Sequence, residues 1–383
     1  MSILILSYAT DPHALAVRWG LRTKGVPAEI YSSAECLTSS PLSAYPNSLR
    51  TELRRPDCEL LGQGFCAEVS SFNVVWNRRM SPVEPPLELH RSDRETACNI
   101  TGRFLDDLRV TTFEGQTWVN DRLKQLYINS KFNQLALAKN LGLRIPETLI
   151  SNDPARVREF VADQGKVIVK PLLPMVWRDE RTDSAGSILA LTTRIDMEAV
   201  RNDVAVRGCP MIYQELIEKE KEYRVLVFGS DVLCVELNTQ KREATSLDWR
   251  AVNPNTLDLR EVPLPNYVRA QLLRFMRKAG LLHGSFDLAV TPAGEVVFFE
   301  INEQGQTLWV EEGNQQIRVL DRLVQFMANP SPDFTYSRDT DLRFADYKGT
   351  DEWAKVEAEV ARRNEEERRH ATAQAKRAGH ASV

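Results

Sequence analysis

The sequence feature that most constrains the fold is the segment at residues 283–302, where two apolar runs flank a Pro-Ala-Gly-Glu turn. Asp287 lies in the first run. Glu300 and Asn302 lie two residues apart in the second run, so both point to the same face of a strand. A hairpin brings Asp287 beside that pair. The segment therefore predicts two carboxylates and an amide on one surface, a group of hard oxygen donors that suits Mg²⁺.

An ordinary hairpin with solvated acids is the alternative for this segment. Residues 296–299 read Val-Val-Phe-Phe, an apolar run that is typical of a buried strand. A carboxylate that ends a buried strand needs a partner, because an isolated charge is costly to remove from water. This setting favours the metal site.

Composition indicates an ordinary globular protein with more than one domain. The chain has 383 residues and a formal net charge of -4 at pH 7, so general affinity for nucleic acid is not expected. Its six cysteines include no Cys-x-x-Cys pair, which argues against a zinc site or a disulfide framework and fits a reducing cytoplasm. We see no signal peptide and no apolar run long enough to cross a bilayer, so we expect a cytoplasmic protein without membrane contact.

Residues 1–120 are predicted to form an α/β unit. An apolar strand at residues 3–6, a helix over residues 14–21 and a strand at residues 28–31 favour a parallel sheet. No Gly-x-Gly-x-x-Gly follows the first strand, so the sequence gives no support for dinucleotide binding.

Two arginines end the strand expected at residues 72–79. Arg78 and Arg79 could clamp a carboxylate or a phosphate, because guanidinium groups bind both in a bidentate way. A pair of solvated arginines beside the proline-rich loop that follows fits the pattern equally well.

Two lysines stand at the ends of predicted elements in the middle of the chain. Residues 126–142 have a helical pattern with Lys131 in the first turn. A buried strand at residues 167–169 presents Lys170 at its end. A lysine so placed either reaches water or meets an anion such as a triphosphate.

The next segments offer groups suited to a nucleotide. Small residues at positions 183–188, with Ser187 among them, predict a flexible loop whose N–H groups can cover phosphates. A strand at residues 211–217 leads into a polar turn, where its backbone groups could pair with an adenine and Glu222 could hold ribose hydroxyls. The strand end that would meet the adenine consists of Gln214, Glu215, Leu216 and Ile217.

Taken in order, these features resemble the ATP-grasp superfamily over about residues 120–325. The resemblance implies that Lys131 and Lys170 hold ATP phosphates and that the Gln-Glu-Leu-Ile segment binds adenine. It also implies that Glu222, seven residues after Glu215, binds ribose. The Mg²⁺ ligands that it implies are Asp287, Glu300 and Asn302.

The fold that this resemblance implies is α/β, with the α+β subdomains of ATP-grasp proteins. We expect an N-terminal pre-ATP-grasp domain at residues 1–120, a central ATP-grasp subdomain at 121–208, a C-terminal ATP-grasp subdomain at 209–329, and a linker with a charged helical tail at 330–383. A solvated terminal helix is the plainer interpretation of the tail. A contact in a homodimer, or a docking element for a peptide, is the other.

Three motifs look like those of the microviridin-type graspetide synthetases, which close ω-ester or ω-amide rings in a precursor peptide. They are Trp-Asn-Arg-Arg at residues 76–79, Asp-Trp-Arg at 248–250 and Asn-Glu-Gln-Gly-Gln at 302–306. Members of that family often have Asn-Pro where this chain has Asn302 and Glu303. The difference leaves the metal ligand in place.

This narrower resemblance implies an ATP-grasp ligase that forms ADP. An Asp or Glu side chain of the peptide attacks the γ-phosphate of ATP, and a Ser or Thr hydroxyl or a Lys amine then attacks the resulting acyl phosphate. The catalytic groups implied are Arg224, Arg250 and Lys170. The expected contacts to an acidic precursor peptide, with its leader and core, are Arg78, Arg79 and Arg250.

Two other functions are compatible with the sequence. One is an ATP-grasp ligase that adds amino acids to the end of a protein or peptide. The other is a protein that binds a nucleotide and a peptide without catalysis, although the presence of Lys170, Asp287, Glu300 and Asn302 argues against it.

Overall fold

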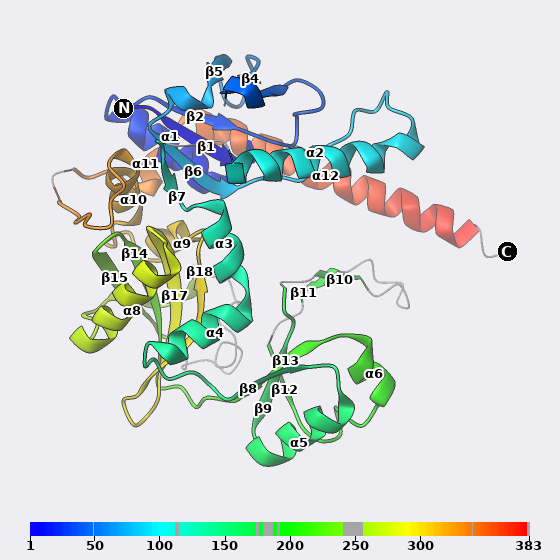
Figure 1. Cartoon of the computed structure of the whole chain (residues 1–383), viewed down its shortest axis with the longest axis vertical. Coiled ribbons are helices and arrows are strands. Elements are labelled where there is room, and N and C mark those ends of the chain that lie inside the picture. The colour runs from blue at the N-terminus through cyan, green and yellow to red at the C-terminus, as the bar shows by residue number, and fades with distance from the viewer. Residues whose placement is uncertain are drawn as a thin grey trace.

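The computed structural model describes residues 1–48, 50–111, 115–173, 176–178, 187–189, 192–239, 256–338 and 340–380 (Figure 1). The strands in these residues form five sheets, two of four strands and one each of five, three and two. The N-terminal sheet lies at the top of Figure 1, and the two larger antiparallel sheets lie below it.

The N-terminal sheet is parallel, as the opening strand-helix-strand pattern predicts, and its strand order is β2-β1-β6-β7. Asp11 begins the first helix, because its carboxylate accepts a hydrogen bond from the His13 N–H at 3.0 Å. Parallel strands end at a common edge, so Arg79 and Asn120 lie at the same edge of this sheet. The elements are β1 (Ile3–Ser7), α1 (Pro12–Thr23), β2 (Ala28–Tyr31), β6 (Val74–Arg79) and β7 (Thr117–Val119).

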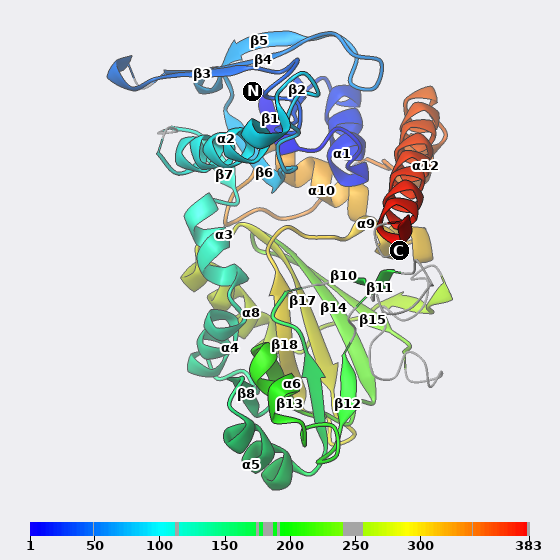
Figure 2. The same ribbon diagram turned by 90° about the vertical axis from the view of Figure 1, so that its right-hand side faces the viewer.

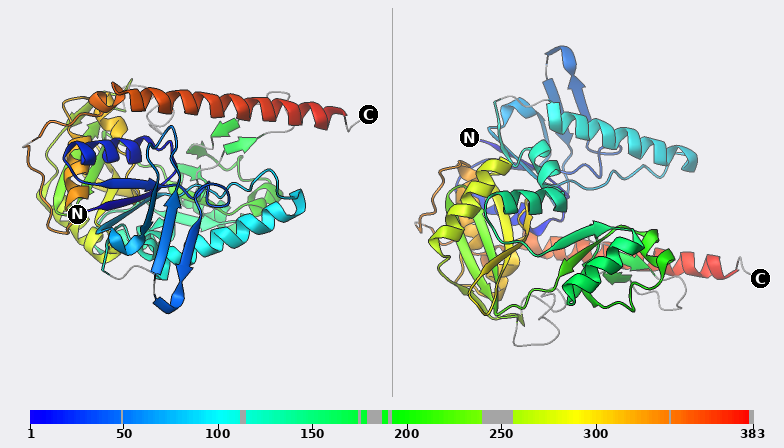
Figure 3. Two further views of the ribbon diagram at one scale, coloured as in Figure 1. Left: turned by 90° about the horizontal axis from the view of Figure 1, so that it is seen from above. Right: turned by 60° about the horizontal axis from the view of Figure 1, so that its bottom comes forward.

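A smaller antiparallel sheet flanks the parallel one and projects from it (Figure 3). Because side chains alternate along β1, Ile3 and Ile5 pack towards α1, whereas Leu4 and Leu6 belong to the core shared with Leu53 of the smaller sheet. The elements are β3 (Leu42–Tyr45), β4 (Arg50–Arg55), β5 (Phe65–Glu68) and the long helix α2 (Arg91–Thr111).

The single helix expected over residues 126–142 is in fact two helices, α3 (Arg122–Asn129) and α4 (Lys131–Asn140). Ser130 separates them, since its backbone is extended and its hydroxyl accepts a hydrogen bond from the Asn133 N–H at 3.4 Å. Lys131 stands in the first turn of α4, as predicted.

The central unit is an antiparallel sheet of order β12-β9-β13-β8, covered on one face by two helices. β13 (Met211–Glu215) pairs with both β8 and β9. The predicted domain boundary at residue 208 therefore falls inside this unit. A separate two-stranded ladder joins β10 (Val176–Arg178) to β11 (Ser187–Leu189). The elements of the unit are β8 (Thr148–Ser151), α5 (Pro154–Gln164), β9 (Val167–Lys170), β12 (Thr193–Ile195), α6 (Asp203–Gly208) and β13 (Met211–Glu215).

The third unit is an antiparallel sheet of order β16-β15-β14-β17-β18 (Figure 2). The predicted amphipathic helix is α8 (Asn266–Ala279), which ends at Gly280 with φ of 68° and covers one apolar face of the sheet. The predicted hairpin at residues 283–302 is confirmed. The strands are β14 (Lys221–Phe228), β15 (Asp231–Leu237), β16 (Leu259–Glu261), β17 (His283–Val290) and β18 (Val296–Asn302).

The other face of this sheet changes character along its strands. Leu226 and Phe228 pack in a core that they share with the N-terminal unit. Arg224 and Asp287 lie further along the same face, beyond that core. The sheet therefore has a polar end and an end buried against the first unit.

The chain returns to the N-terminal unit after β18, through α9 (Leu308–Gly313), α10 (Val319–Ala328) and α11 (Phe344–Lys348). Glycine permits the close approach of α1 to α10, because a Cβ at Gly20 would lie 2.5 Å from Cγ2 of Val324. α11 lies within the segment expected to be a linker, and its Phe344 and Tyr347 are buried.

The predicted charged helix is α12 (Asp351–His380), which starts on the N-terminal unit and then extends away from it (Figure 3). Its first turns are packed, with Val356 buried and Glu352 bonded to Arg18 at 3.0 Å. Among the described residues, no helix combines the length and the apolar character that crossing a membrane requires.

Candidate active site

Two neighbouring strands carry the residues predicted to bind metal, and a third places Arg224 beside them. Arg224 on β14 pairs with Asp287 on β17, and Asp287 pairs with Glu300 on β18, so the three side chains form a row across one face of the sheet. Asn302 lies one step along, opposite Ser285. The hairpin thus places two carboxylates and an amide beside one another.

A cation lies against each carboxylate of the row. The Lys131 Nζ is 2.6 Å from Oε2 of Glu300, and the Arg224 Nη1 is 2.5 Å from Oδ1 of Asp287. Burial raises the pKa of Asp287, Arg224 opposes that rise, and the neighbouring charge of Glu300 adds to it. The two carboxylates therefore repel each other and favour positive charge between or beside them.

The chemistry of the donors fits Mg²⁺. This ion prefers oxygen ligands and commonly takes one or two carboxylates, leaving room for water and phosphate oxygens. No cluster of three or more His, Cys, Asp or Glu side chains suited to a metal occurs in the described part of the chain. The predicted set has two carboxylates, and its third donor is the amide of Asn302.

Lys170 ends β9 in the central sheet, opposite Ile212 of β13. Val167 and Val169 of the same strand belong to the core beneath α5. Because side chains alternate, Lys170 lies on the sheet face that turns away from α5. Gln214 lies on that face too, and its amide donates a hydrogen bond to Oγ1 of Thr148 at 2.8 Å.

The predicted adenine segment connects the central sheet to the third sheet. The Glu215 side chain accepts a hydrogen bond from the Glu147 N–H at 3.2 Å, and the Leu216 N–H donates to the Lys166 carbonyl at 2.9 Å. The Ile217 N–H has no hydrogen bond to another described residue. It is therefore a backbone donor that a ligand could use.

Glu222, the predicted ribose ligand, lies at the start of β14 and is 8% exposed. Its Oε1 accepts hydrogen bonds from Nζ of Lys219 and Oγ1 of Thr239, each at 2.7 Å. The carboxylate is thus held in place two residues before Arg224 and on the same face of the strand.

The two arginines at the end of β6, Arg78 and Arg79, have different environments in the structure. Arg78 is 2% exposed, and its Nε lies 3.1 Å from Oδ2 of Asp11. Its Nη1 donates to the carbonyl of Gln304, so both ends of the guanidinium are occupied. A buried, paired arginine supports the structure around it. Arg79, the next residue, is exposed, so of these two arginines it is the one that a substrate could reach.

For two predicted site residues, the structure describes only the backbone or nothing at all. Arg250 lies in residues 240–255, outside the described residues, together with the rest of the Asp-Trp-Arg motif. The backbone of Ser187 belongs to β11, and its side chain is not described. Their predicted roles stay predictions.

Sequence reasoning missed two residues that organise the site. His13 accepts hydrogen bonds from the N–H groups of Thr307 and Leu308, and the Asn120 amide bridges residues 282–283 and Glu303. Neither belongs to a motif. The only local signal is that each follows a strand of the parallel sheet, at the edge where ligand sites commonly form.

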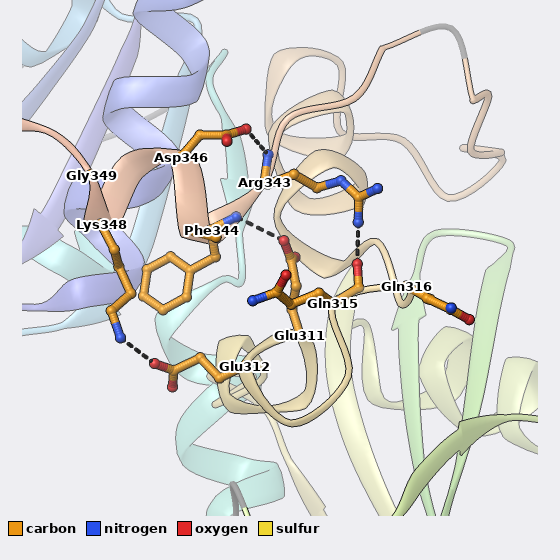
Figure 4. A pocket seen from close by; sticks show the side chains of 10 residues that line it. Glu311, Glu312, Gln315, Gln316, Arg343, Phe344, Asp346, Lys348 and Gly349 are labelled. Carbon is orange, nitrogen blue, oxygen red and sulfur yellow. Dashed lines mark hydrogen bonds and ion pairs between the residues drawn. The ribbon is translucent and has the colours of Figure 1, made fainter.

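A concave region lies between α9 and α11, apart from these residues, with a volume of about 810 Å³ (Figure 4). Lys348 Nζ is 2.8 Å from Oε1 of Glu312, and Oε1 of Glu311 accepts a hydrogen bond from the Phe344 N–H at 2.7 Å. These contacts join α9 to α11, so we interpret the charged groups of this pocket as braces between the two helices.

The chain has the ATP-grasp fold, because its structure is similar to those of ATP-grasp ligases over most of its length. No protein-family model and no curated protein sequence matches the chain. The similarity is therefore one of structure, at sequence identities below a quarter.

Three solved structures illustrate the similarity. A RiPP-associated ATP-grasp ligase from Chryseobacterium gregarium, in complex with ADP and a leader and core peptide, has a TM-score of 0.76 at 22% identity and covers 89% of this chain and 99% of its own. The macrocyclase MdnC from Microcystis aeruginosa MRC, bound with precursor peptide MdnA, has a TM-score of 0.73 at 23% identity and covers 86% and 100%. The ATP-grasp ligase PsnB, complexed with minimal precursor, Mg and ADP, has a TM-score of 0.65 at 18% identity and covers 85% and 97%.

Proposed function

We propose that this protein is an ATP-dependent, ADP-forming ligase that activates a carboxyl group as an acyl phosphate. The observation that carries the proposal is the row of Arg224, Asp287 and Glu300, with Lys131 against its far end. Two adjacent carboxylates flanked by cations suit the binding of a metal-bound triphosphate. The ATP-grasp fold supports the same interpretation.

ATP and Mg²⁺ are the proposed cosubstrate and cofactor. Asp287, Glu300 and Asn302 would hold the metal, which when bound neutralises charge on the phosphate groups. Lys131 and Lys170 supply fixed positive charge for the phosphates. Mg and ADP in the PsnB complex support this assignment.

The remaining nucleotide contacts follow from the positions of two segments. The backbone of residues 214–217 would bind adenine, with the Ile217 N–H as a donor, and Glu222 would accept hydrogen bonds from the ribose. Ser187, on the β10–β11 ladder, is the proposed contact from the phosphate-covering loop.

The proposed substrate is an acidic precursor peptide with a leader and a core. A side-chain carboxylate oxygen attacks the γ-phosphorus, the bond to the bridging oxygen breaks, and ADP leaves. A Ser or Thr hydroxyl, or a Lys amine, then attacks the acyl carbon and loses its proton as inorganic phosphate departs. The product is an ω-ester or ω-amide ring, and the peptide loses one water per ring.

Three arginines have proposed roles in this chemistry. Arg224 would stabilise the acyl phosphate, and the position of its guanidinium beside Asp287 supports this role. Arg250 is the second candidate for that role and for substrate binding. Arg79, exposed at the end of β6, would meet acidic residues of the peptide.

Peptides in the complexes of similar structures favour this function over the alternatives. The Chryseobacterium ligase is bound to a leader and core peptide and MdnC to a precursor peptide, which supports a peptide as the substrate. A fold does not fix the acceptor, however, so addition of amino acids to a peptide end is the second candidate.

Trapping with hydroxylamine tests acyl-phosphate formation directly. We expect an acidic peptide incubated with the protein, ATP, Mg²⁺ and hydroxylamine to gain hydroxamates in proportion to the ADP released. Release of ADP without hydroxamate or ring formation would contradict carboxyl activation. No ADP release and no nucleotide binding would contradict the ligase altogether.

A further inference from the structure

The loop that follows the metal-binding strand is held by the N-terminal unit. We call residues 303–308 the ligand loop, because it begins directly after Asn302. The Asn120 Nδ2 donates to the Glu303 carbonyl at 2.8 Å, and the Arg78 Nη1 donates to the Gln304 carbonyl at 2.5 Å. Two consecutive carbonyls of the ligand loop are thus bonded to side chains more than 180 residues away in the sequence.

His13 holds the other end of the ligand loop. Its Nε2 accepts hydrogen bonds from the N–H groups of Thr307 and Leu308, at 2.9 and 3.1 Å. An imidazole nitrogen accepts only when it carries no proton, and burial together with the charge of Arg78 lowers the pKa of His13 to about 3. The ring is therefore neutral at ordinary pH and serves as a fixed acceptor.

The three side chains are themselves fixed. Asp11, which is fully buried, accepts a hydrogen bond from Nε of Arg78 at 3.1 Å and another from Oγ of Ser7 at 2.8 Å. The Asn120 amide makes four hydrogen bonds, because it also bonds the backbone at Leu282 and His283. It therefore ties the start of β17 to the end of β18.

We propose that His13, Arg78 and Asn120 are positioning residues, which act through the ligand loop to set Asn302 and Glu300 for Mg·nucleotide binding. The inference rests on the proposed function. It makes the N-terminal unit part of the machinery for phosphoryl transfer, although none of the three residues touches the carboxylates. Partners that orient metal ligands commonly change metal affinity or activity by about 10- to 100-fold when they are lost.

Substitution of His13 gives a matched pair of variants. His13→Gln keeps an acceptor at the end of a side chain of similar reach, whereas His13→Leu leaves both N–H groups of the ligand loop without one. We expect His13→Leu to lower the gain in ADP affinity on addition of Mg²⁺ by about 10-fold in titration calorimetry. ADP affinity without Mg²⁺ stays within about threefold of wild type, and His13→Gln restores most of the lost gain.

Arg78 and Arg18 give a second pair, which separates positioning from stability. Both are buried arginines that donate to a backbone carbonyl, but Arg18 bonds Leu61, away from the ligand loop. We expect Arg78→Lys to reduce the Mg²⁺-dependent gain and raise the Mg²⁺ concentration for half-maximal turnover. Arg18→Lys leaves both unchanged, even where it lowers the unfolding temperature equally.

The outcomes are distinct. An unchanged Mg²⁺-dependent gain in both His13→Leu and Arg78→Lys would overturn the positioning role, as would an equal loss in Arg18→Lys. If His13→Leu fails to fold, Arg78→Lys against Arg18→Lys decides the matter. Wild-type protein that binds ADP no better with Mg²⁺ than without it would instead contradict the proposed function.

Discussion

Arg224 and Lys131 show, at the scale of single residues, how the site keeps two carboxylates together. Each cation neutralises one acid, at 2.5 and 2.6 Å, so Asp287 and Glu300 can share one face of a partly buried sheet. The same cations carry the charge that a triphosphate needs. In the proposed function, this pairing would prepare the site for a ligand that brings both phosphate and metal.

Replacing Asp287 by Asn tests this arrangement, because it removes one negative charge and preserves the size of the side chain. We expect ADP release to fall by about 100-fold or more, since a metal site contributes several kcal/mol to the transition state. Glu236→Gln is the control, because Glu236 lies on β15 opposite Tyr223, on the other face of the same sheet. Equal rates for Asp287→Asn and wild type in a coupled ADP assay would refute the assignment.

Two buried histidines make stability depend on pH. Burial lowers the pKa of His13 from 6.5 to about 3 and that of His283 from 6.5 to about 4. The unfolded chain therefore binds protons below about pH 6.5 that the folded chain does not bind, and protons favour unfolding. We expect the free energy of unfolding to fall as pH is lowered through this range, by on the order of 1 kcal/mol per pH unit for each histidine.

Urea unfolding of wild type and His13→Gln at several pH values measures this effect. The variant lacks one of the two groups, so its stability should fall less steeply between about pH 6.5 and 4. Parallel curves for the two proteins would show that His13 is not a neutral, buried ring.

At the scale of an element, the ligand loop is constrained by the side chain that packs against its turn. It turns at Gly305, where φ is 58°, and a Cβ there would lie 2.0 Å from Nε2 of His283. The His283 ring is fixed in turn, because it stacks on Phe228 with ring centroids 4.7 Å apart and its Nδ1 lies 2.9 Å from the Val227 carbonyl. The His283 ring is therefore a packing partner of the loop, which has little freedom to move.

Gly305→Ala should therefore lower the free energy of unfolding by more than the strain of a positive φ alone would. Gly294→Ala is the control, because Gly294 has φ of 80° and open space around its Cβ position. We expect Gly294→Ala to lower the free energy of unfolding by about 1–2 kcal/mol. Gly305→Ala should lower it by more and should also reduce ADP release. Equal losses of stability with full activity in both variants, by urea unfolding and kinetics, would show that the loop is less constrained.

Sequence patterns predicted the elements that carry the site better than they predicted the long-range contacts around those elements. Alternation and turn residues are local signals, and they located the hairpin with Asp287 and Glu300 and the helical segment that contains Lys131, although they did not show the break between α3 and α4. The burial of Arg78 could not be read in this way. It depends on Asp11, which the pairing of β1 with β6 brings close to it, and on Gln304, which the chain reaches only after it has crossed two other units.

At the scale of the whole molecule, the C-terminal helices complete the first unit. Phe344, Tyr347 and Val356 are buried in the core that also contains the side chains of α1. Beyond these residues, α12 carries ion pairs on its own surface, such as Arg362 with Glu366. The start of α12 therefore belongs to the fold, and its distal part contributes little to it.

Two truncations test this division. A chain that ends at Asn329 loses the three buried side chains, each worth roughly 2 kcal/mol of burial, and should unfold at lower temperature or fail to fold. A chain that ends at Ala361 should keep the unfolding temperature and the ADP release of the full protein. Reduced peptide affinity or a smaller assembly for the Ala361 chain, by calorimetry and light scattering, would assign the distal helix to docking or to a homodimer.

Intact mass of an acidic precursor peptide, after incubation with the protein, ATP and Mg²⁺, tests the proposed function most directly. We predict losses of whole water molecules with wild type and none with Asp287→Asn. Mass gains of amino-acid units would contradict ring closure and support the ligase that extends a peptide end. No change in mass and no ADP release, with a panel of acidic peptides, would contradict the account.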